Sequence, residues 1–328
     1  MNGRTRPLPS VVREFDCTGG TIIAYGHDTY TEPLRTDTTD YYQNPLDMDG
    51  VSHCSRDVTM TRATIERDPD LYRHRSMSNV ITLYDIPSRD IKDNAWSPNT
   101  WKTRFSLNYK GLPYKTVWVE YPDIARVCQE IGAEPTSTSE YDTPKYTLPV
   151  IYDPSTKTVL AESAKIARYL DETYPDTPVL IPRGSSALHA AFQYAFAQMV
   201  SQPALPLMLP ATNNILNPSS EAFYRRTRES WFGKLEDWSP PGPIREKHWE
   251  ELRAALARVA GWMALDDEDK PFFMGDTICY ADITIASILV WMKRVLGPKS
   301  QEWARVKTWD GGKWGSFMQA FDKYEMVL

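Results

Sequence analysis

The clearest structural signal in the chain lies in Ala95-Trp96-Ser97-Pro98-Asn99-Thr100-Trp101-Lys102-Thr103-Arg104-Phe105-Ser106-Leu107. This segment follows the apolar run 80–86 and closes at Gly111. Serine is favoured at a helix N-cap, proline suits the first helical position, and glycine often follows the last turn. The pattern therefore predicts a strand over 80–86, a short polar loop and a helix over 97–110.

The start of the predicted helix is a candidate site for an anion. The first amides of a helix lack intrahelical acceptors and lie at the positive end of the helix dipole. The hydroxyl of Ser97 at this position has two possible roles. It can cap the helix, or it can stabilise a bound anion, of which a thiolate is one example.

The next hundred residues continue in an alternating pattern of strands and helices. Apolar periodicity and turn residues predict two further strands and a hairpin, separated by helices and by one polar loop. The predicted elements are a strand over 114–120, a helix over 122–132, a loop over 133–145, hairpin strands over 147–152 and 158–160, and a helix over 163–174. The resulting order, β-α-β-α-β-β-α, is that of a thioredoxin-like domain, with a parallel strand pair joined by a crossover.

The remainder of the chain is predicted to be helical. The predicted helices cover 189–200, 219–238, 244–265 and 280–296, and the last is apolar on nearly every face. We therefore expect an α/β thioredoxin-like domain over 77–182 and an all-α domain over 183–328.

Residues 1–76 differ from the rest of the chain in composition. They contain no lysine and none of the eleven tryptophans. Apolar periodicity is absent as well, so this segment cannot bury enough surface to offset its ordering entropy. We expect a disordered N-terminal extension.

Composition excludes several classes of function. The net charge of −6 gives no general attraction to nucleic acid or to anionic membranes, and no apolar run is long enough to span a bilayer. Four cysteines, Cys17, Cys54, Cys128 and Cys279, lack metal-ligand spacing. With no secretory signal at the N-terminus, we expect a cytoplasmic protein in a reducing compartment, without a metal ion.

Two short motifs and the predicted order of domains resemble the glutathione transferases. Ser97-Pro98, followed by Lys102 and Arg104, resembles the catalytic helix start of that family. Leu148-Pro149 resembles its cis-proline turn. The resemblance implies that the backbone of Leu148 pairs with the cysteinyl part of glutathione.

Two further motifs extend the resemblance. Glu162-Ser163 resembles the family's pair at the next helix start, which implies a site for the γ-glutamyl carboxylate, in keeping with the anion affinity of helix N-termini. The run from Gly275-Asp276 to Ala281-Asp282-Ile283 resembles its structural capping motif. At the cap position, Cys279 is expected to be a buried small side chain and not a nucleophile.

A finer resemblance covers residues 80–328. The segment 227–236 is similar to a helix of the fungal Fu-type A transferases, which are similar in turn to bacterial glutathione-dependent β-etherases. Within this segment, Trp231, Phe232 and Leu235 are expected to pack in the core.

The resemblance implies a transferase that uses glutathione as co-substrate, in detoxification or in secondary metabolism. A hydrogen bond from Ser97 would favour the thiolate, which then attacks a hydrophobic electrophile. Asn99 and Thr100 are alternative donors. A homodimer is expected from the family alone.

Two other functions remain open. One is a glutathione-dependent β-etherase or tailoring enzyme acting on an aromatic metabolite. The other is a non-catalytic carrier of apolar ligands. The pair Glu162-Ser163 counts against the carrier, because a carrier does not need a γ-glutamyl site.

Overall fold

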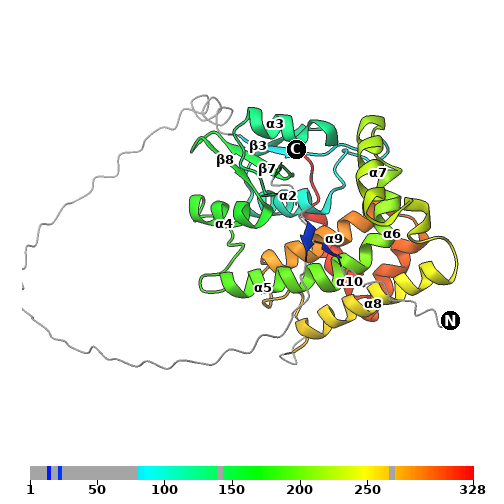
Figure 1. The fold of residues 1–328 in the computed structure, drawn as a ribbon. Coiled ribbons are helices and arrows are strands. Elements are labelled where there is room, and N and C mark those ends of the chain that lie inside the picture. The colour runs from blue at the N-terminus through cyan, green and yellow to red at the C-terminus, as the bar shows by residue number, and fades with distance from the viewer. Residues whose placement is uncertain (1–12, 16–20, 24–79, 139–142, 266–269) are drawn as a thin grey trace, which may run out of the picture.

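A computed structural model describes residues 13–15, 21–23, 80–138, 143–265 and 270–328. The predicted extension, residues 1–76, lies outside this part of the chain except for a short antiparallel pair, β1 (Arg13–Phe15) and β2 (Thr21–Ile23). Residues 80–328 form a mixed sheet with helices on both faces, followed by a helical half (Figure 1).

The sheet has the strand order β4-β3-β7-β8. Its strands are β3 (Ile81–Asp85), β4 (Tyr114–Trp118), β7 (Val150–Asp153) and β8 (Thr158–Ala161). β3 and β4 run parallel, whereas β7 is antiparallel to both β3 and β8. This topology confirms the predicted thioredoxin-like order.

Helices cover both faces of the sheet. They are α2 (Pro98–Lys110), α3 (Ile124–Glu130), which follows the 3₁₀ turn η1 (Tyr121–Asp123), and α4 (Ser163–Thr173). α2 packs against α4, and α3 lies on the other side of the sheet (Figure 1). As predicted, α2 ends at Gly111, whose φ of 67° is left-handed.

The second half of the chain is helical. Its elements are α5 (Ser186–Phe196), the π-helical turn η2 (Ala197–Ser201), α6 (Gln202–Asn213), α7 (Pro218–Phe232), η3 (Leu235–Asp237), α8 (Pro243–Met263), α9 (Tyr280–Leu296), α10 (Gln301–Phe321) and η4 (Asp322–Tyr324). α9 is the central helix, and its residues from Tyr280 to Met292 are all buried. Among the helices that the structure describes, none has the length and apolarity needed to cross a membrane.

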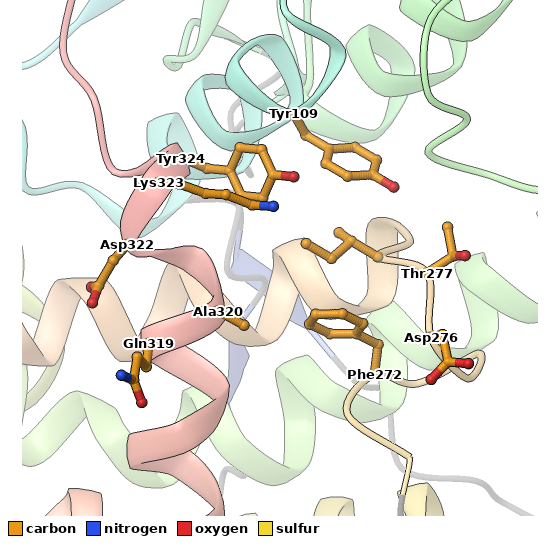
Figure 2. Close-up of a pocket in the computed structure, with 10 residues that line it drawn as sticks. Tyr109, Phe272, Asp276, Thr277, Gln319, Ala320, Asp322, Lys323 and Tyr324 are labelled. Carbon is orange, nitrogen blue, oxygen red and sulfur yellow. The ribbon is translucent and has the colours of Figure 1, made fainter.

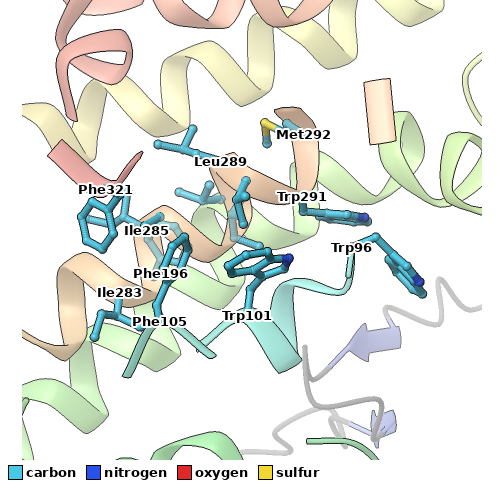
Figure 3. Packing of buried hydrophobic residues seen from close by; sticks show 14 of the residues in the cluster. Trp96, Trp101, Phe105, Phe196, Ile283, Ile285, Leu289, Trp291, Met292 and Phe321 are labelled. Atoms are coloured by element: carbon cyan, nitrogen blue, oxygen red, sulfur yellow. The ribbon is translucent and has the colours of Figure 1, made fainter. Parts of the chain in front are cut away.

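The two halves share one core. Phe105 of α2 packs between Trp101 of the same helix, at 4.7 Å between ring centres, and Phe321 of α10, at 5.2 Å (Figure 3). All three rings are fully buried. α2 is therefore part of the thioredoxin-like half in sequence, and it also packs against the helical half.

Several sequence expectations needed correction. The segment 133–145, predicted to be a loop, contains two short paired strands, β5 (Ser137–Thr138) and β6 (Pro144–Lys145). The hairpin begins later than expected, at Val150, because Pro149 has no amide hydrogen for a ladder. The single helix expected over 219–238 is divided at Gly233, where φ is 82°.

The predicted core residues of that segment can be followed in part. Leu235 is 1% exposed, which confirms its expected burial. The side chains of Trp231 and Phe232 lie outside the described part of the structure.

Candidate functional site

The register of the sheet brings three separate segments to one edge. Tyr84 of β3 pairs with Val150 of β7, and Val150 pairs with Ala161 of β8. β3 and β8 end at this edge, whereas β7 begins there. The chain after β3 leads through a loop to Ser97, the residues before β7 are Leu148-Pro149, and the residues after β8 are Glu162-Ser163.

Ser97 occupies the N-cap position of α2, as predicted. Its φ of −65° and ψ of 125° are extended, and its carbonyl accepts from the Trp101 amide at 3.0 Å. The Ser97 hydroxyl makes no capping bond to the described backbone of its helix. The side chain is 5% exposed, so a ligand that reached it would be shielded from water.

Asn99 and Thr100 differ from Ser97 in their contacts. The Thr100 hydroxyl donates to the carbonyl of Ser97 at 3.1 Å, and the side chain is fully buried. Asn99 is half-buried, and its Oδ1 accepts from Lys102 Nζ at 3.2 Å. The three candidates therefore lie on one helix turn but present different groups.

A buried ion pair fixes α2 to the sheet. Arg104 Nη2 lies 2.7 Å from Asp85 Oδ2, and both side chains are fully buried. Arg104 Nη1 also donates to the Tyr114 hydroxyl at 3.1 Å and to Thr116 Oγ1 at 3.0 Å. Because Asp85 also accepts from the Ile86 amide, the end of β3 is tied to the helix that starts at Ser97.

The two other predicted motifs have distinctive backbone conformations. The Leu148-Pro149 peptide bond is cis, and both residues are buried. Glu162 has a φ of 78°, a left-handed value that is uncommon for a residue with a side chain. Ser163, the first residue of α4, is 8% exposed.

Tyr280 from the helical half lies beside Glu162 and Ser163. Burial raises the pKa of Tyr280, and the charge of Glu162 raises it further against an opposing effect of the Ser163 hydroxyl. The phenol therefore stays protonated at neutral pH. From the sequence, Tyr280 was expected only to begin a core helix, and no local motif marks it as a residue of the site.

An aromatic cluster lies beside Trp96, the residue before Ser97. The Trp96 and Tyr121 ring centres are 6.4 Å apart, and Tyr121 stacks with Phe223 of α7 at 6.1 Å. The Arg228 guanidinium lies 4.2 Å from the centre of the Tyr224 ring. No motif in the sequence marks these rings as a cluster, although parallel β3 and β4 bring Trp96 and Tyr121 to the same edge.

A cavity of about 560 Å³ lies at the other end of α2 (Figure 2). Its walls include Tyr109, Phe272, Thr277, Lys323 and Tyr324. None of the predicted site residues lines it, so this cavity is separate from the segments gathered around Ser97.

Cys279 behaves as a structural residue. It is 1% exposed, and it forms a capping box with Asp282, whose Oδ2 accepts from the Cys279 amide at 2.9 Å. Burial and the neighbouring carboxylate raise the pKa of the thiol, which disfavours a nucleophilic thiolate. Within the described ranges, no three side chains of the usual metal-ligating types cluster together.

The sequence matches two domains of one family. Residues 96–173 match the glutathione S-transferase N-terminal domain, and residues 187–324 match the glutathione S-transferase C-terminal domain. The matched ranges lie on either side of the domain boundary expected between residues 182 and 183.

Solved structures show the same similarity. A glutathione S-transferase of Ceriporiopsis subvermispora, solved in complex with glutathione, is 58% identical and has a TM-score of 0.74, covering 76% of this chain and 99% of its own. Glutathione transferase GSTFuA3 of Phanerochaete chrysosporium is 42% identical with a TM-score of 0.72, covering 76% and 98%. Among curated proteins, the glutathione S-transferase-like protein ustS of Aspergillus flavus is 33% identical over 218 residues, which are 61% of this chain and 75% of that protein.

Proposed function

Because this chain belongs to the glutathione S-transferase family, we propose that it binds glutathione at the edge defined by Ser97, Leu148 and Ser163 and activates its thiol. The observation that carries the proposal is the sheet register, which gathers these three segments at one edge. Each segment offers a different part of a tripeptide site: a hydroxyl at a helix start, a backbone beside a cis-proline and a second helix start.

The γ-glutamyl carboxylate is assigned to the start of α4. The first amides of this helix and the hydroxyl of Ser163 are donors that an anion can use. The left-handed conformation of Glu162 sets the direction in which the chain enters the helix. The protonated phenol of Tyr280, adjacent to Ser163, supports this position from the helical half.

The thiol is assigned to the start of α2. Free cysteine thiols have a pKa of about 8.5, so only a few per cent of glutathione is ionised at neutral pH. A hydrogen bond from Ser97 and the positive end of the helix dipole would both favour the thiolate. Asn99 and Thr100 remain alternative donors, and Thr100 is the least suited because its hydroxyl already bonds the Ser97 carbonyl.

The proposed reaction is transfer of glutathione to a hydrophobic aromatic electrophile. The thiol loses its proton to solvent, the thiolate forms a carbon–sulfur bond, and the leaving group departs with its electron pair. We place the electrophile against the half-buried rings of Tyr121 and Phe223, which lie beside the buried Trp96. These rings lie beside the residue that carries the proposed donor.

Calorimetric titration of the whole protein with glutathione tests the proposed site. We expect saturable binding, and we expect Ser163→Ala to weaken it by roughly tenfold or more, because a hydrogen bond to a charged group is lost. Ser219→Ala, an exposed serine in the first turn of α7, is the matched control and should bind as the parent does. Absence of glutathione binding, or equal binding by Ser163→Ala, would contradict the assignment.

The products distinguish the remaining alternatives. Conjugation of an activated aryl halide supports a transferase, whereas a phenol released from an aryl ether supports the β-etherase. A protein that neither binds nor consumes glutathione supports the carrier. We also propose a homodimer, on the family resemblance alone, and a cytoplasmic location, on the sequence; sedimentation tests the first and cell fractionation the second.

A further inference from the structure

The loop that leads to Ser97 has an unusual conformation. Asp93 and Asn94 are successive residues with φ of 63° and 60°. Left-handed backbone is disfavoured for residues with a Cβ, although Asp and Asn tolerate it better than most. Such conformations persist when surrounding contacts hold them in place, and they are enriched near functional sites.

A single arginine from the helical half bonds both ends of this turn. Arg294 Nη1, near the end of α9, donates to the carbonyl of Lys92 at 3.2 Å and to the carbonyl of Ala95 at 3.1 Å. These two acceptors bracket the left-handed pair, and Ala95 is two residues before Ser97. The guanidinium also lies 4.6 Å from the centre of the Trp101 ring in the first turns of α2.

The C-terminal segment fixes the direction of this arginine. Glu325 Oε1 accepts from Arg294 Nε at 3.0 Å, and Glu325 Oε2 lies 2.7 Å from Lys293 Nζ. The Arg294 and Glu325 side chains are each 11% exposed, so water competes little for these bonds. After α10 the chain runs along α2 (Figure 1), where Asn108 in the last turn of that helix donates to the carbonyls of Tyr324 at 2.6 Å and Met326 at 2.9 Å.

We propose that Arg294 is a positioning residue for the thiol site, and that Glu325 orients its guanidinium. This inference rests on the proposed function, because it assigns Arg294 the task of holding the loop that sets Ser97 and the first amides of α2. The planar guanidinium supplies separate donors to Glu325 and to the loop carbonyls. A lysine would keep the charge but could not reproduce that fork.

The test uses Arg294→Lys, Arg294→Gln and Glu325→Gln in the full chain. For each variant, the pKa of the bound glutathione thiol is measured from the ultraviolet absorbance of the thiolate, together with kcat and the dissociation constant of glutathione. We expect both Arg294 variants to raise the thiol pKa by about one unit, which corresponds to roughly a tenfold smaller thiolate fraction at neutral pH. The dissociation constant should change much less, because the γ-glutamyl site lies on α4.

Lys293→Gln is the matched control. Lys293 shares Glu325 with Arg294, but its ion pairs are with Glu325 at 2.7 Å and Asp322 at 3.5 Å and not with the loop. This variant should keep the parent's thiol pKa and kcat. Glu325→Gln, which keeps an oxygen acceptor but loses the charge, should raise the thiol pKa by less than the Arg294 variants do.

Three outcomes would overturn the inference. In the first, both Arg294 variants keep the parent's thiol pKa while only the thermal midpoint falls. In the second, Arg294→Lys has the parent's thiol pKa and Arg294→Gln does not, which would show that the positive charge matters and the geometry of the guanidinium does not. In the third, Lys293→Gln shifts the thiol pKa as much as Arg294→Lys. If the thiol of glutathione bound to the parent protein has the same pKa as the thiol of free glutathione, the proposed function itself is contradicted.

Discussion

Three polar side chains at the start of α2 differ in the bonds that they already make. Thr100 donates to a carbonyl of its own helix, and Asn99 accepts from Lys102. Ser97 sits at the N-cap with no capping bond from its hydroxyl to the described helix backbone. The sequence could place all three on one turn, but only side-chain coordinates separate them.

Replacing these residues one at a time should affect the thiol pKa and kcat to different extents. Ser97→Ala should raise the pKa of the bound thiol and lower kcat by about a hundredfold to a thousandfold, by analogy with the loss of one oxyanion donor. Glutathione affinity should change little, because the carboxylate site is elsewhere. Ser219→Ala, at the exposed serine of α7, is the control and should retain activity. Pre-steady-state conjugation kinetics measure these effects, and a larger loss in Asn99→Ala than in Ser97→Ala would reassign the donor.

The ion pair between Asp85 and Arg104 leads to a prediction about stability. Asp85→Asn removes one charge of a fully buried pair and leaves the other without its counter-ion, at a cost of about 3–5 kcal/mol. Glu130→Gln removes a partner of Arg126 in an exposed pair, which water screens, so the free energy of unfolding should change little. Urea unfolding compares the two variants. Equal losses of unfolding free energy in the two variants would contradict the larger effect expected for the buried ion pair.

At the scale of elements, some helices were predicted closely and others were missed. The apolar run over 280–296 predicted the bounds of α9 because every face of that helix is buried. α6 was missed because Pro206 and Pro210 lie inside it, and proline removes an amide donor. Burial of Ala204, Leu207 and Met208 stabilises α6 in spite of its two prolines.

α10 was missed for a different reason. Residues 309–312, Trp-Asp-Gly-Gly in sequence, have non-helical φ and ψ values inside the element, so the chain kinks there. The glycines interrupt the apolar periodicity from which a helix is predicted. Trp309 packs against Trp249 of α8, at 6.1 Å between ring centres, and Trp314 Nε1 donates to Asp310 Oδ2 at 2.6 Å, so these contacts hold the two parts of α10 in place.

α5 carries a buried histidine, His189, which should make the free energy of unfolding of the protein depend on pH. Burial lowers the pKa of His189, whose Nε2 has no hydrogen-bond partner among the described residues. Below pH 6.5, the unfolded chain therefore binds the proton more readily than the folded chain does. The unfolding free energy should fall as the pH falls from about 6.5 toward the lowered folded value, by at most about 1.4 kcal/mol per pH unit.

His189→Gln is the variant that isolates this effect. Glutamine does not titrate, so the difference in unfolding free energy between the parent and the variant should itself change with pH below 6.5. Urea unfolding at a series of pH values measures that difference. A difference that stays constant from pH 7 to pH 5 would show that His189 does not contribute to the dependence.

At the scale of the whole molecule, the sheet and the helical half share their core through α2. Phe105 is fully buried between rings from α2 and α10 (Figure 3). We therefore expect the two halves to unfold together. Phe105→Ala should cost about 3–5 kcal/mol and lower a single calorimetric transition. Two separate transitions, only one of which shifts, would contradict a shared core.

The sequence predicted the order of the domains and the three motifs, but not how the halves contact each other. The helix start at Ser97 could be predicted from a local capping signal, whereas Leu148-Pro149 and Glu162-Ser163 were identified by their resemblance to motifs of the glutathione transferases. The contacts of Arg294 with the loop and of Tyr280 with the α4 start join residues that are distant in sequence. No local pattern reports such contacts, because they depend on how α9 packs against α2.

A crystal structure of the protein with glutathione bound tests the central claim most directly. The account predicts that the glutathione sulfur lies within hydrogen-bond distance of Ser97 Oγ at the start of α2. It also predicts that the γ-glutamyl carboxylate accepts from Ser163 at the start of α4. A sulfur atom placed away from the α2 terminus, with Ser97 not facing it, would contradict the account.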